Sequence, residues 1–235
     1  MIDKVVVVTG SNKGIGFSIV KELCKRGVKT VYLTARDEGR GNKAVSDLKA
    51  EGLNPHFHLL DVTDLNSIKK FAVYLKKVHG GVDILINNAG ITQVLNVPFD
   101  YEHIARIVDI NYRGVLRVQN EFFPIIKRNG RVINVASGWG HLFFLRNPYW
   151  LKVLSNEDIT IEDVNAFIDW YLESVKNKSL TNKDFVNETC NGYKASKMAI
   201  CAVTRAKQRM MDREDTRNIS INISICTMLK PIPLL

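Results

Sequence analysis

The sequence predicts a doubly wound α/β fold, in which helices cover both faces of a parallel sheet to give three layers. Short unbroken runs of Val, Ile and Leu recur along the chain, and stretches with a single apolar helical stripe alternate with them. Strands alternating with helices at this spacing are typical of βαβ units. A chain of 235 residues can bury one core of this kind, so we expect a single domain over residues 1–235.

The expected elements follow one another from the start of the chain. Residues 4–9 read KVVVVT, a β-branched run typical of a strand buried on both faces. Residues 14–26 place Ile15, Ile19 and Leu23 on one face of a helix. Further strands are expected at 30–35, 55–60, 82–87, 131–136 and 219–226, and further helices at 38–51, 64–79, 102–127, 160–176 and 193–212. Right-handed crossovers would join the strands into a parallel sheet.

The composition argues against several classes of protein. A hydrophobic content of 46% without low-complexity tracts indicates a globular chain. The apolar run near the start is too short for a secretory signal, and no later run approaches a membrane span, so we expect a cytoplasmic protein. The four cysteines lack metal-ligand spacing, which favours reduced thiols and no metal. The net charge of +9 is spread among acids, which favours a solvated surface or an anionic small molecule over nucleic acid.

A glycine-rich loop directly follows the first expected strand and opens the first helix. Sheets of this kind bind ligands beyond the carboxyl ends of their strands. Glycines there permit a tight turn and a close approach of the backbone to phosphate, and the helix start offers free N–H groups to the anion. The spacing is GxxxGxG, without the Gly-Lys-Ser/Thr end of a P-loop. We expect a dinucleotide pyrophosphate to bind here, at Gly10, Ser11, Asn12, Lys13, Gly14, Ile15 and Gly16.

The end of the second strand bears on the choice between NAD and NADP. Folds that bind NAD usually carry an acid there for the ribose 2′-hydroxyl. This chain has Arg36 at that point, and Asp37 comes only after it. A guanidinium suits a 2′-phosphate, which Lys13 could also reach. Arg36 as a solvated surface residue and Asp37 turned inward stay open as alternatives, but the sequence favours NADPH/NADP as the cofactor.

Six short motifs occur in order along the chain. A Tyr-xxx-Lys pair alone is expected by chance, whereas six motifs in register are not. The motifs are TGSNKGIG, Asp61-Val62, Asn87-Asn88-Ala89-Gly90, Asn111-Tyr-Arg-Gly114, Ser137 and Tyr193-xxx-Lys197. Together they resemble the short-chain dehydrogenases/reductases. Within that family, TGSNKGIG, LTARD, LDV and the long gap between Ser137 and Tyr193 are similar to the monomeric NADPH-dependent carbonyl reductases.

The resemblance implies a Rossmann-like fold and NADPH-dependent reduction of a small-molecule carbonyl substrate. Tyr193 would donate the proton, and Ser137 would hydrogen-bond the carbonyl oxygen. Lys197, one helical turn further on, would bind the nicotinamide ribose and lower the pKa of the tyrosine. Asn111 would hold a water that relays protons to the lysine. Further contacts to the cofactor would come from Asp61 at the adenine, and from Val62, Asn88, Ala89 and Gly90.

The stretch between Ser137 and Tyr193 contains an insert, residues 140–190, that is too long for a structureless loop. Thr160 can cap a helix that carries an apolar stripe. With the aromatic runs at 141–145 and 148–150, which include His141, this insert would line an apolar pocket for quinones, aromatic ketones or aldehydes. Plain core packing is the alternative. By resemblance, the insert covers the helices that tetrameric relatives use for assembly, which implies a monomer.

The carboxyl terminus departs from the family pattern. The strand at 219–226 normally leads into a Pro-Gly turn, but here Pro231 comes several residues late and no glycine follows it. We expect a divergent or shortened end that leaves this strand as an exposed sheet edge. Poorer positioning of the nicotinamide would lower the rate. A catalytically weakened NADP-binding or partner-binding protein is therefore the alternative function.

Overall fold

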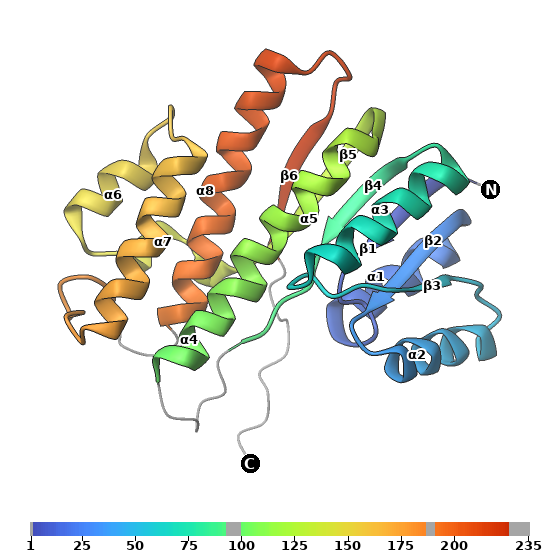
Figure 1. The fold of residues 1–235 in the computed structure, drawn as a ribbon, viewed down its shortest axis with the longest axis horizontal. Coiled ribbons are helices and arrows are strands. Elements are labelled where there is room, and N and C mark those ends of the chain that lie inside the picture. Colours follow the sequence, from blue (N-terminus) through green and yellow to red (C-terminus); the bar gives the residue numbers. More distant parts are fainter. Residues whose placement is uncertain (1, 93–99, 187–190, 226–235) are drawn as a thin grey trace.

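The computed structural model describes residues 2–92, 100–186 and 191–225, and these form one six-stranded sheet. The strands are β1 (Ile2–Val8), β2 (Val28–Ala35), β3 (His56–Leu59), β4 (Val82–Asn87), β5 (Ile126–Ala136) and β6 (Ser220–Ile225). Their order is β3-β2-β1-β4-β5-β6, and all neighbouring pairs are parallel. The predicted doubly wound α/β fold is confirmed (Figure 1).

Helices cover both faces of this sheet (Figure 1). One face carries α1 (Gly14–Lys25) and α2 (Glu38–Ala50), and the other carries α3 (Leu65–His79), α5 (Gly114–Phe122) and α8 (Asn191–Glu214). In β1, Val7 belongs to the core cluster that holds Phe71 of α3, while Val8 belongs to the cluster that holds Val20 of α1. Successive side chains of a strand point to opposite faces, so an unbroken valine run buries both.

The insert packs beside α8, where it forms a third apolar cluster with α4 (Tyr101–Val108) (Figure 1). Its helix α7 (Ile161–Lys176) begins with a capping box: Asp163 N donates to Thr160 Oγ1 at 3.1 Å, and Thr160 N donates to Asp163 Oδ2 at 3.0 Å. The helix predicted at 160–176 is confirmed. The sequence reading missed α6 (Pro148–Ser155), which Asn147 caps and Pro148 opens.

The helix predicted at 102–127 is wrong in its extent. α4 ends at Val108, a π-helical turn spans Asp109–Arg113, and α5 ends at Phe122. A 3₁₀ turn over Phe123–Ile125 then leads directly into β5, which starts well before the predicted residue 131. Pro124 lies in that turn and has no N–H to donate, so the α-helix cannot continue through it.

β6 is the last strand at its side of the sheet among the described residues, as expected for an edge strand. It pairs with β5 from Arg131–Ser220 to Ala136–Ile225. Ile223 and Ile225 are exposed. The predicted departure at Pro231 lies outside the described residues.

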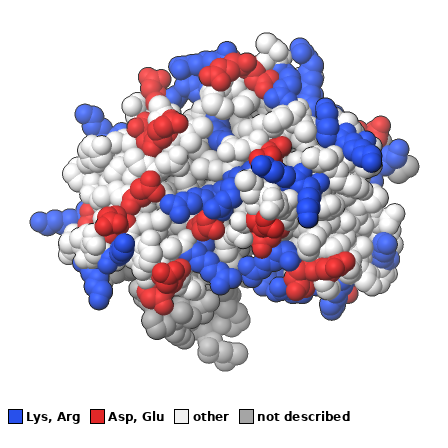
Figure 2. All heavy atoms as spheres, in the orientation of Figure 1, with Lys and Arg blue, Asp and Glu red and all other residues white. Residues whose placement is uncertain are grey.

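The surface carries charges of both signs. Figure 2 shows Lys and Arg interspersed with Asp and Glu across the face in view. This agrees with the mixed charge pattern of the sequence. Within the described ranges, none of the helices combines the length and the apolar character that a bilayer span needs.

Candidate active site

Two adjoining cavities lie at the carboxyl ends of the strands, where a doubly wound sheet binds its ligand. The smaller, of about 180 Å³, reaches the ends of β2 and β3, and the larger, of about 860 Å³, reaches the end of β5 and the start of α8. Both are lined by Gly10, Lys13, Gly90 and Ile91. The two cavities therefore form one elongated crevice, in which the glycine loop is the shared wall.

The glycine loop is pressed against the loop that follows β4. Gly10 has φ +60°, and a Cβ there would lie 2.8 Å from Ala89 Cα. A Cβ on Gly16 would lie 2.4 Å from Asn88 Nδ2. Asn88 Nδ2 in turn donates to Thr9 O at 2.9 Å and to Gly10 O at 3.0 Å. Only glycine fits at both positions, which agrees with the predicted role of the loop.

The structure places the side chain of Ser11 inside the protein, whereas a residue that contacts the cofactor is expected at the surface of the cavity. Its side chain is fully buried, its hydroxyl donates to Val8 O at 2.8 Å, and it accepts from Thr34 N at 2.9 Å. Ser11 N also donates to Thr34 O at 2.8 Å. The serine thus fastens the glycine loop to β1 and β2, and a contact between Ser11 and the cofactor stays a prediction.

The amino terminus of α1 differs from those of the neighbouring helices. Asp37 caps α2 and Asp64 caps α3 by accepting from backbone N–H groups, whereas Lys13 at the start of α1 provides no side-chain cap. The first turn of α1 also carries no acidic residue. Gly14 and Ile15 line the larger cavity at this point, and Asn12 lines the smaller one. The N–H groups and the helix dipole are thus available to an anion such as a pyrophosphate.

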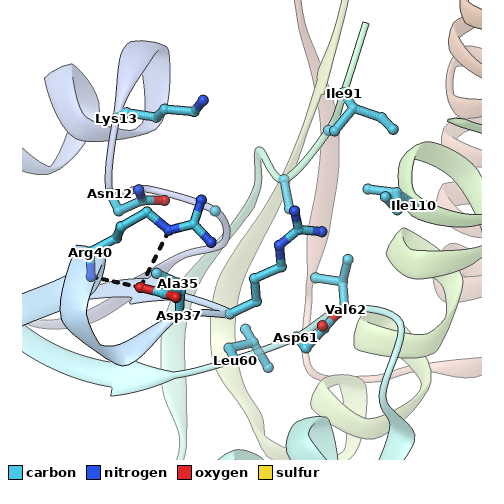
Figure 3. A pocket seen from close by; sticks show the side chains of 14 residues that line it. Asn12, Lys13, Ala35, Asp37, Arg40, Leu60, Asp61, Val62, Ile91 and Ile110 are labelled. Carbon is cyan, nitrogen blue, oxygen red and sulfur yellow. Dashed lines mark hydrogen bonds and ion pairs between the residues drawn. The ribbon is translucent and has the colours of Figure 1, made fainter.

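The far end of the smaller cavity is cationic. Arg36 and Arg40 line it, together with Asp37, and Lys13 adds a further cation where the two cavities meet. Asp37 Oδ1 accepts from Arg40 N at 2.8 Å and lies 3.3 Å from Arg40 Nε, and these contacts with Arg40 lower the pKa of the Asp37 carboxyl. Figure 3 shows Arg40 beside Asp37, with Asn12 and Lys13 on the same side of the cavity and Ile91 and Ile110 opposite.

This arrangement favours Arg36 and Arg40 over an inward Asp37 as the groups that face a nucleotide. The carboxylate is engaged as the cap of α2 and as the partner of Arg40. Arg40 itself was missed by the sequence reading. Its spacing from the cap Asp37 could have indicated it. A residue three positions after a helix cap lies in the first turn of the helix, and its side chain can turn back toward the end of the strand.

The opposite wall of the smaller cavity is formed at the end of β3. Asp61 and Val62 line it, on the same side of the cavity as Ile110 (Figure 3). Asp61 Oδ1 accepts from Thr63 N at 2.9 Å and from Thr63 Oγ1 at 2.7 Å, which fixes the carboxylate at the rim. An acceptor beside apolar walls suits an adenine, as predicted for Asp61 and Val62.

Three residues of the predicted catalytic group line the larger cavity together: Ser137, Tyr193 and Lys197. Lys197 Nζ lies 5.5 Å from the centre of the Tyr193 ring and donates to Val135 O at 2.8 Å. Lys197 is buried, and this burial lowers its pKa to about 8. The tyrosine and the lysine thus share one cavity, with the ammonium on its poorly hydrated side.

Asn111, the fourth predicted catalytic residue, lies in the π-helical turn after α4 and is fully buried. Its Nδ2 donates to Ile91 O at 2.9 Å and to Ser196 Oγ at 3.1 Å, and its Oδ1 accepts from Ile91 N at 2.8 Å. Both amide hydrogens are therefore used to tie the loop after β4 to α8. A relay water at Asn111 stays a prediction.

The insert side of the larger cavity has an aromatic wall, formed by Trp139 and Phe144, whose ring centres lie 4.9 Å apart. Of the other aromatic residues proposed for the pocket, Phe143 and Tyr149 are largely exposed and Trp150 is buried in the apolar cluster. His141 is exposed and lines neither of the two cavities, so the expectation that it helps to line the pocket is wrong. Trp139, between Gly138 and Gly140, was missed because no apolar periodicity marks it.

Comparison with known proteins agrees with this geometry. The profile of the family described as short chain dehydrogenase matches residues 4–149. The chain belongs to the short-chain dehydrogenase family. It is 36% identical to a protein of Sus scrofa that is named carbonyl reductase [NADPH] 1. The match covers 95% of this chain and 76% of that protein. The chain is 39% identical to the protein of the same name from Bos taurus, over 89% of this chain and 76% of the relative.

Two solved structures of reductases superpose closely on the chain. Salutaridine reductase from Papaver somniferum matches with a TM-score of 0.84 and 29% identity, over 94% of this chain and 85% of its own. Menthone neomenthol reductase from Mentha piperita matches with a TM-score of 0.83 and 26% identity, over 95% of this chain and 89% of its own. The predicted family and the Rossmann-like fold of this short-chain dehydrogenase are both confirmed.

Proposed function

We propose that this short-chain dehydrogenase reduces bulky apolar carbonyl compounds, such as quinones, aromatic ketones and aldehydes, to alcohols with NADPH. The observation that carries the proposal is the single crevice, which joins a cationic end at Arg36 and Arg40 to a second end where Ser137, Tyr193 and Lys197 meet. Relatives at 36–39% identity are named carbonyl reductases that use NADPH.

The residues of the crevice fit NADPH. Gly10 lets the loop lie directly against Ala89, where a Cβ would collide, and the uncapped start of α1 supplies N–H donors to a phosphate. Arg36, Arg40 and Lys13 suit the 2′-phosphate, which an inward carboxylate would repel. Asp61 and Val62 would hold the adenine. When bound, NADPH supplies the hydride for the reduction.

The remaining chemistry is assigned to three side chains. Tyr193 donates a proton to the carbonyl oxygen, and Ser137 hydrogen-bonds the same oxygen and orients it. Lys197 stabilises the tyrosinate that is left behind. Lowering the pKa of a tyrosine phenol from about 10 to about 7 takes about 4 kcal/mol, whereas an exposed ion pair contributes about 0–1 kcal/mol. The burial of Lys197 supports this role, because charges interact more strongly where water is scarce.

The substrate class is inferred from the wall of the larger cavity. Trp139 and Phe144 present ring surfaces on the same cavity as Tyr193. Flat apolar substrates bury area on such rings, while Ser137 and Tyr193 provide the few polar groups that orient a carbonyl.

We also propose a cytosolic monomer. The helix α7 packs against α4 and α8, and its side chains Val164, Phe167 and Ile168 are buried there, so this apolar surface is already covered. Cys24 and Cys201 are unpaired, which agrees with a reducing compartment. Light scattering on purified protein tests the oligomeric state, and a stable tetramer would contradict this part of the proposal.

The decisive experiment follows NADPH absorbance with menadione, 2-acetonaphthone or an aromatic aldehyde as substrate. Carbonyl-dependent oxidation of NADPH that is lost in Tyr193→Phe supports the proposal. Tight NADPH binding without turnover of any of these compounds would instead favour the non-catalytic NADP-binding alternative.

A further inference from the structure

Lys194, the residue after Tyr193, is a charged side chain enclosed in the protein. It is 0% exposed. An ammonium group is almost never fully buried unless specific partners replace its water, because desolvation of the charge is costly. The identity of those partners therefore indicates what the lysine stabilises.

The Lys194 ammonium contacts the aromatic wall of the larger cavity. Nζ lies 5.0 Å from the centre of the Trp139 ring and 5.4 Å from the centre of the Phe144 ring. It also donates to Val186 O at 3.1 Å. Cations attract aromatic faces within about 6 Å, and the attraction is stronger where the cation is desolvated. Both rings are thus held by the same charge.

The backbone around these rings is joined to the lysine as well. Val186 N donates to Phe144 O at 2.8 Å, and Leu145 pairs with Phe185 in a short antiparallel bridge. Lys194 therefore contacts both the ring of Phe144 and the segment that fixes its backbone. Since Tyr193 is the preceding residue of α8, the wall is tied directly to the helix that carries the proton donor.

We propose that Lys194 is a positioning residue for substrate selectivity, which holds the Trp139–Phe144 wall in the orientation that receives planar aromatic carbonyls. The inference rests on the proposed function. Without the ammonium, both rings gain alternative rotamers, and a flat substrate must order them on binding. A small aliphatic ketone makes little use of the wall and is affected less.

The test compares two methyl ketones, 2-acetonaphthone and 2-hexanone, in wild type and Lys194→Met. Methionine is unbranched and only one atom shorter than lysine, so it keeps most of the packing of the side chain but removes the charge. We expect the ratio of kcat/KM for the aromatic over the aliphatic ketone to fall about fivefold, mainly because KM for the aromatic ketone rises, with Kd for NADPH unchanged.

The chain offers a matched control in Lys207→Met. Lys207 is also buried in α8, donates to Asn120 Oδ1 at 3.2 Å and lies 4.9 Å from the centre of the Phe123 ring. It lies about 20 Å further along the helix, away from the catalytic end. We expect its selectivity ratio to stay within about twofold of wild type, since loss of one such contact there affects stability alone. An equal fall in both variants would overturn the inference.

Two further results separate the possible failures. Trp139→Leu should lower the ratio as Lys194→Met does, and the double variant should lower it no further, because both changes remove the same element. A folded Lys194→Met with the wild-type ratio overturns the inference, and Lys194→Gln serves in its place if the methionine variant does not fold. If wild type reduces neither these ketones nor menadione nor an aromatic aldehyde, the proposed function fails. Binding of 1-(2-naphthyl)ethanol to the protein, followed by quenching of indole fluorescence, then still tests the role of Lys194. We expect the alcohol to bind more weakly to Lys194→Met than to wild type. Equal binding to both would overturn the role of Lys194.

Discussion

The glycine loop and the aromatic wall border the same cavity, but different forces hold them in place. The glycine loop is fixed by backbone contacts and short polar side chains, with Gly10 against Ala89 and Asn88 bonded to Thr9 O and Gly10 O. The wall is fixed by ring contacts and one buried ammonium. Backbone contacts leave no space for another side chain, whereas rings can repack. We therefore expect cofactor binding to tolerate substitution poorly and substrate choice to be adjustable.

The largest expected effect lies where the two regions meet. Tyr193→Phe removes one hydroxyl and leaves both regions intact. We expect kcat to fall about 10³-fold, because a positioned general acid contributes about 10²–10⁴-fold. Kd for NADPH should change less than about twofold if the hydroxyl acts in chemistry. Single-turnover absorbance and cofactor titration measure the two quantities.

The control for this substitution is Tyr149→Phe, which removes the hydroxyl of a largely exposed tyrosine in the insert. Its kcat should match wild type. Residual activity of Tyr193→Phe above a tenth of wild type would exclude the tyrosine as the proton donor.

The next largest effect is expected from a substitution that disrupts the glycine loop. Gly10→Ala places a Cβ 2.8 Å from Ala89 Cα at a residue with φ +60°. We expect Kd for NADPH to rise on the order of a hundredfold and the free energy of unfolding to fall by about 2–4 kcal/mol. Calorimetric titration and urea unfolding provide the measurements.

Gly39→Ala is the matched control, because a Cβ there meets only Asp37 Oδ1, at an ordinary 3.6 Å, inside helix α2. It should bind NADPH normally and gain up to about 1 kcal/mol of stability. Normal cofactor affinity in Gly10→Ala would show that the close contact with Ala89 is not needed.

A smaller effect is expected from a substitution at the cationic end of the crevice. Arg36→Ala removes one guanidinium from the cavity wall. We expect KM for NADPH to rise about tenfold or more while KM for NADH stays nearly constant, since a hydrogen bond to a charged group contributes about 1.5–3 kcal/mol. Steady-state kinetics with both cofactors give the ratio. Arg26→Ala, at an exposed ion pair with Glu22, should change neither value, and an equal rise for both cofactors in Arg36→Ala would contradict the role in 2′-phosphate binding.

The smallest effect concerns stability, at a buried lysine away from both regions. Burial lowers the pKa of Lys207 to about 8, below its ordinary value near 10.5. Between pH 8 and 10.5 the unfolded chain keeps a proton that the folded chain releases, so the free energy of unfolding rises with pH across that window. Below pH 8 Lys207 is protonated in both the folded and the unfolded state, and desolvation of its ammonium group destabilises the folded state.

Lys207→Met should therefore raise stability at about pH 7 by about 1–2 kcal/mol and reduce the rise between pH 8 and 10.5. Part of the rise should remain, because Lys197 has a similarly lowered pKa. Urea unfolding at several pH values measures the difference. A less stable variant at neutral pH would show that the bond to Asn120 outweighs the cost of burial.

The two regions also differed in how far the sequence predicted them. The glycine loop, Arg36 and Asp61 follow strand ends, so short local patterns locate them. The contacts of Trp139 and Lys194 depend on packing between residues far apart in the chain, which no spacing reveals. The sequence placed Ser11 in the right loop, but the pattern does not show which side chains turn inward, and that of Ser11 is buried against β1 and β2. The helix predicted through Pro124 was wrong because apolar periodicity outweighed the missing N–H of proline.

The uncapped start of α1 has a consequence for motion in this chain. At the starts of α2, α3 and α7 a side chain accepts a hydrogen bond from one backbone N–H, so that amide hydrogen should exchange more slowly than its neighbours, with or without nucleotide. The first turn of α1 lacks such a side chain, and a bound pyrophosphate would complete it. Deuterium uptake at Ile15 and Gly16 should then fall as NADPH is added. The bound nucleotide would thus stabilise the first turn of α1 in addition to acting as a reactant.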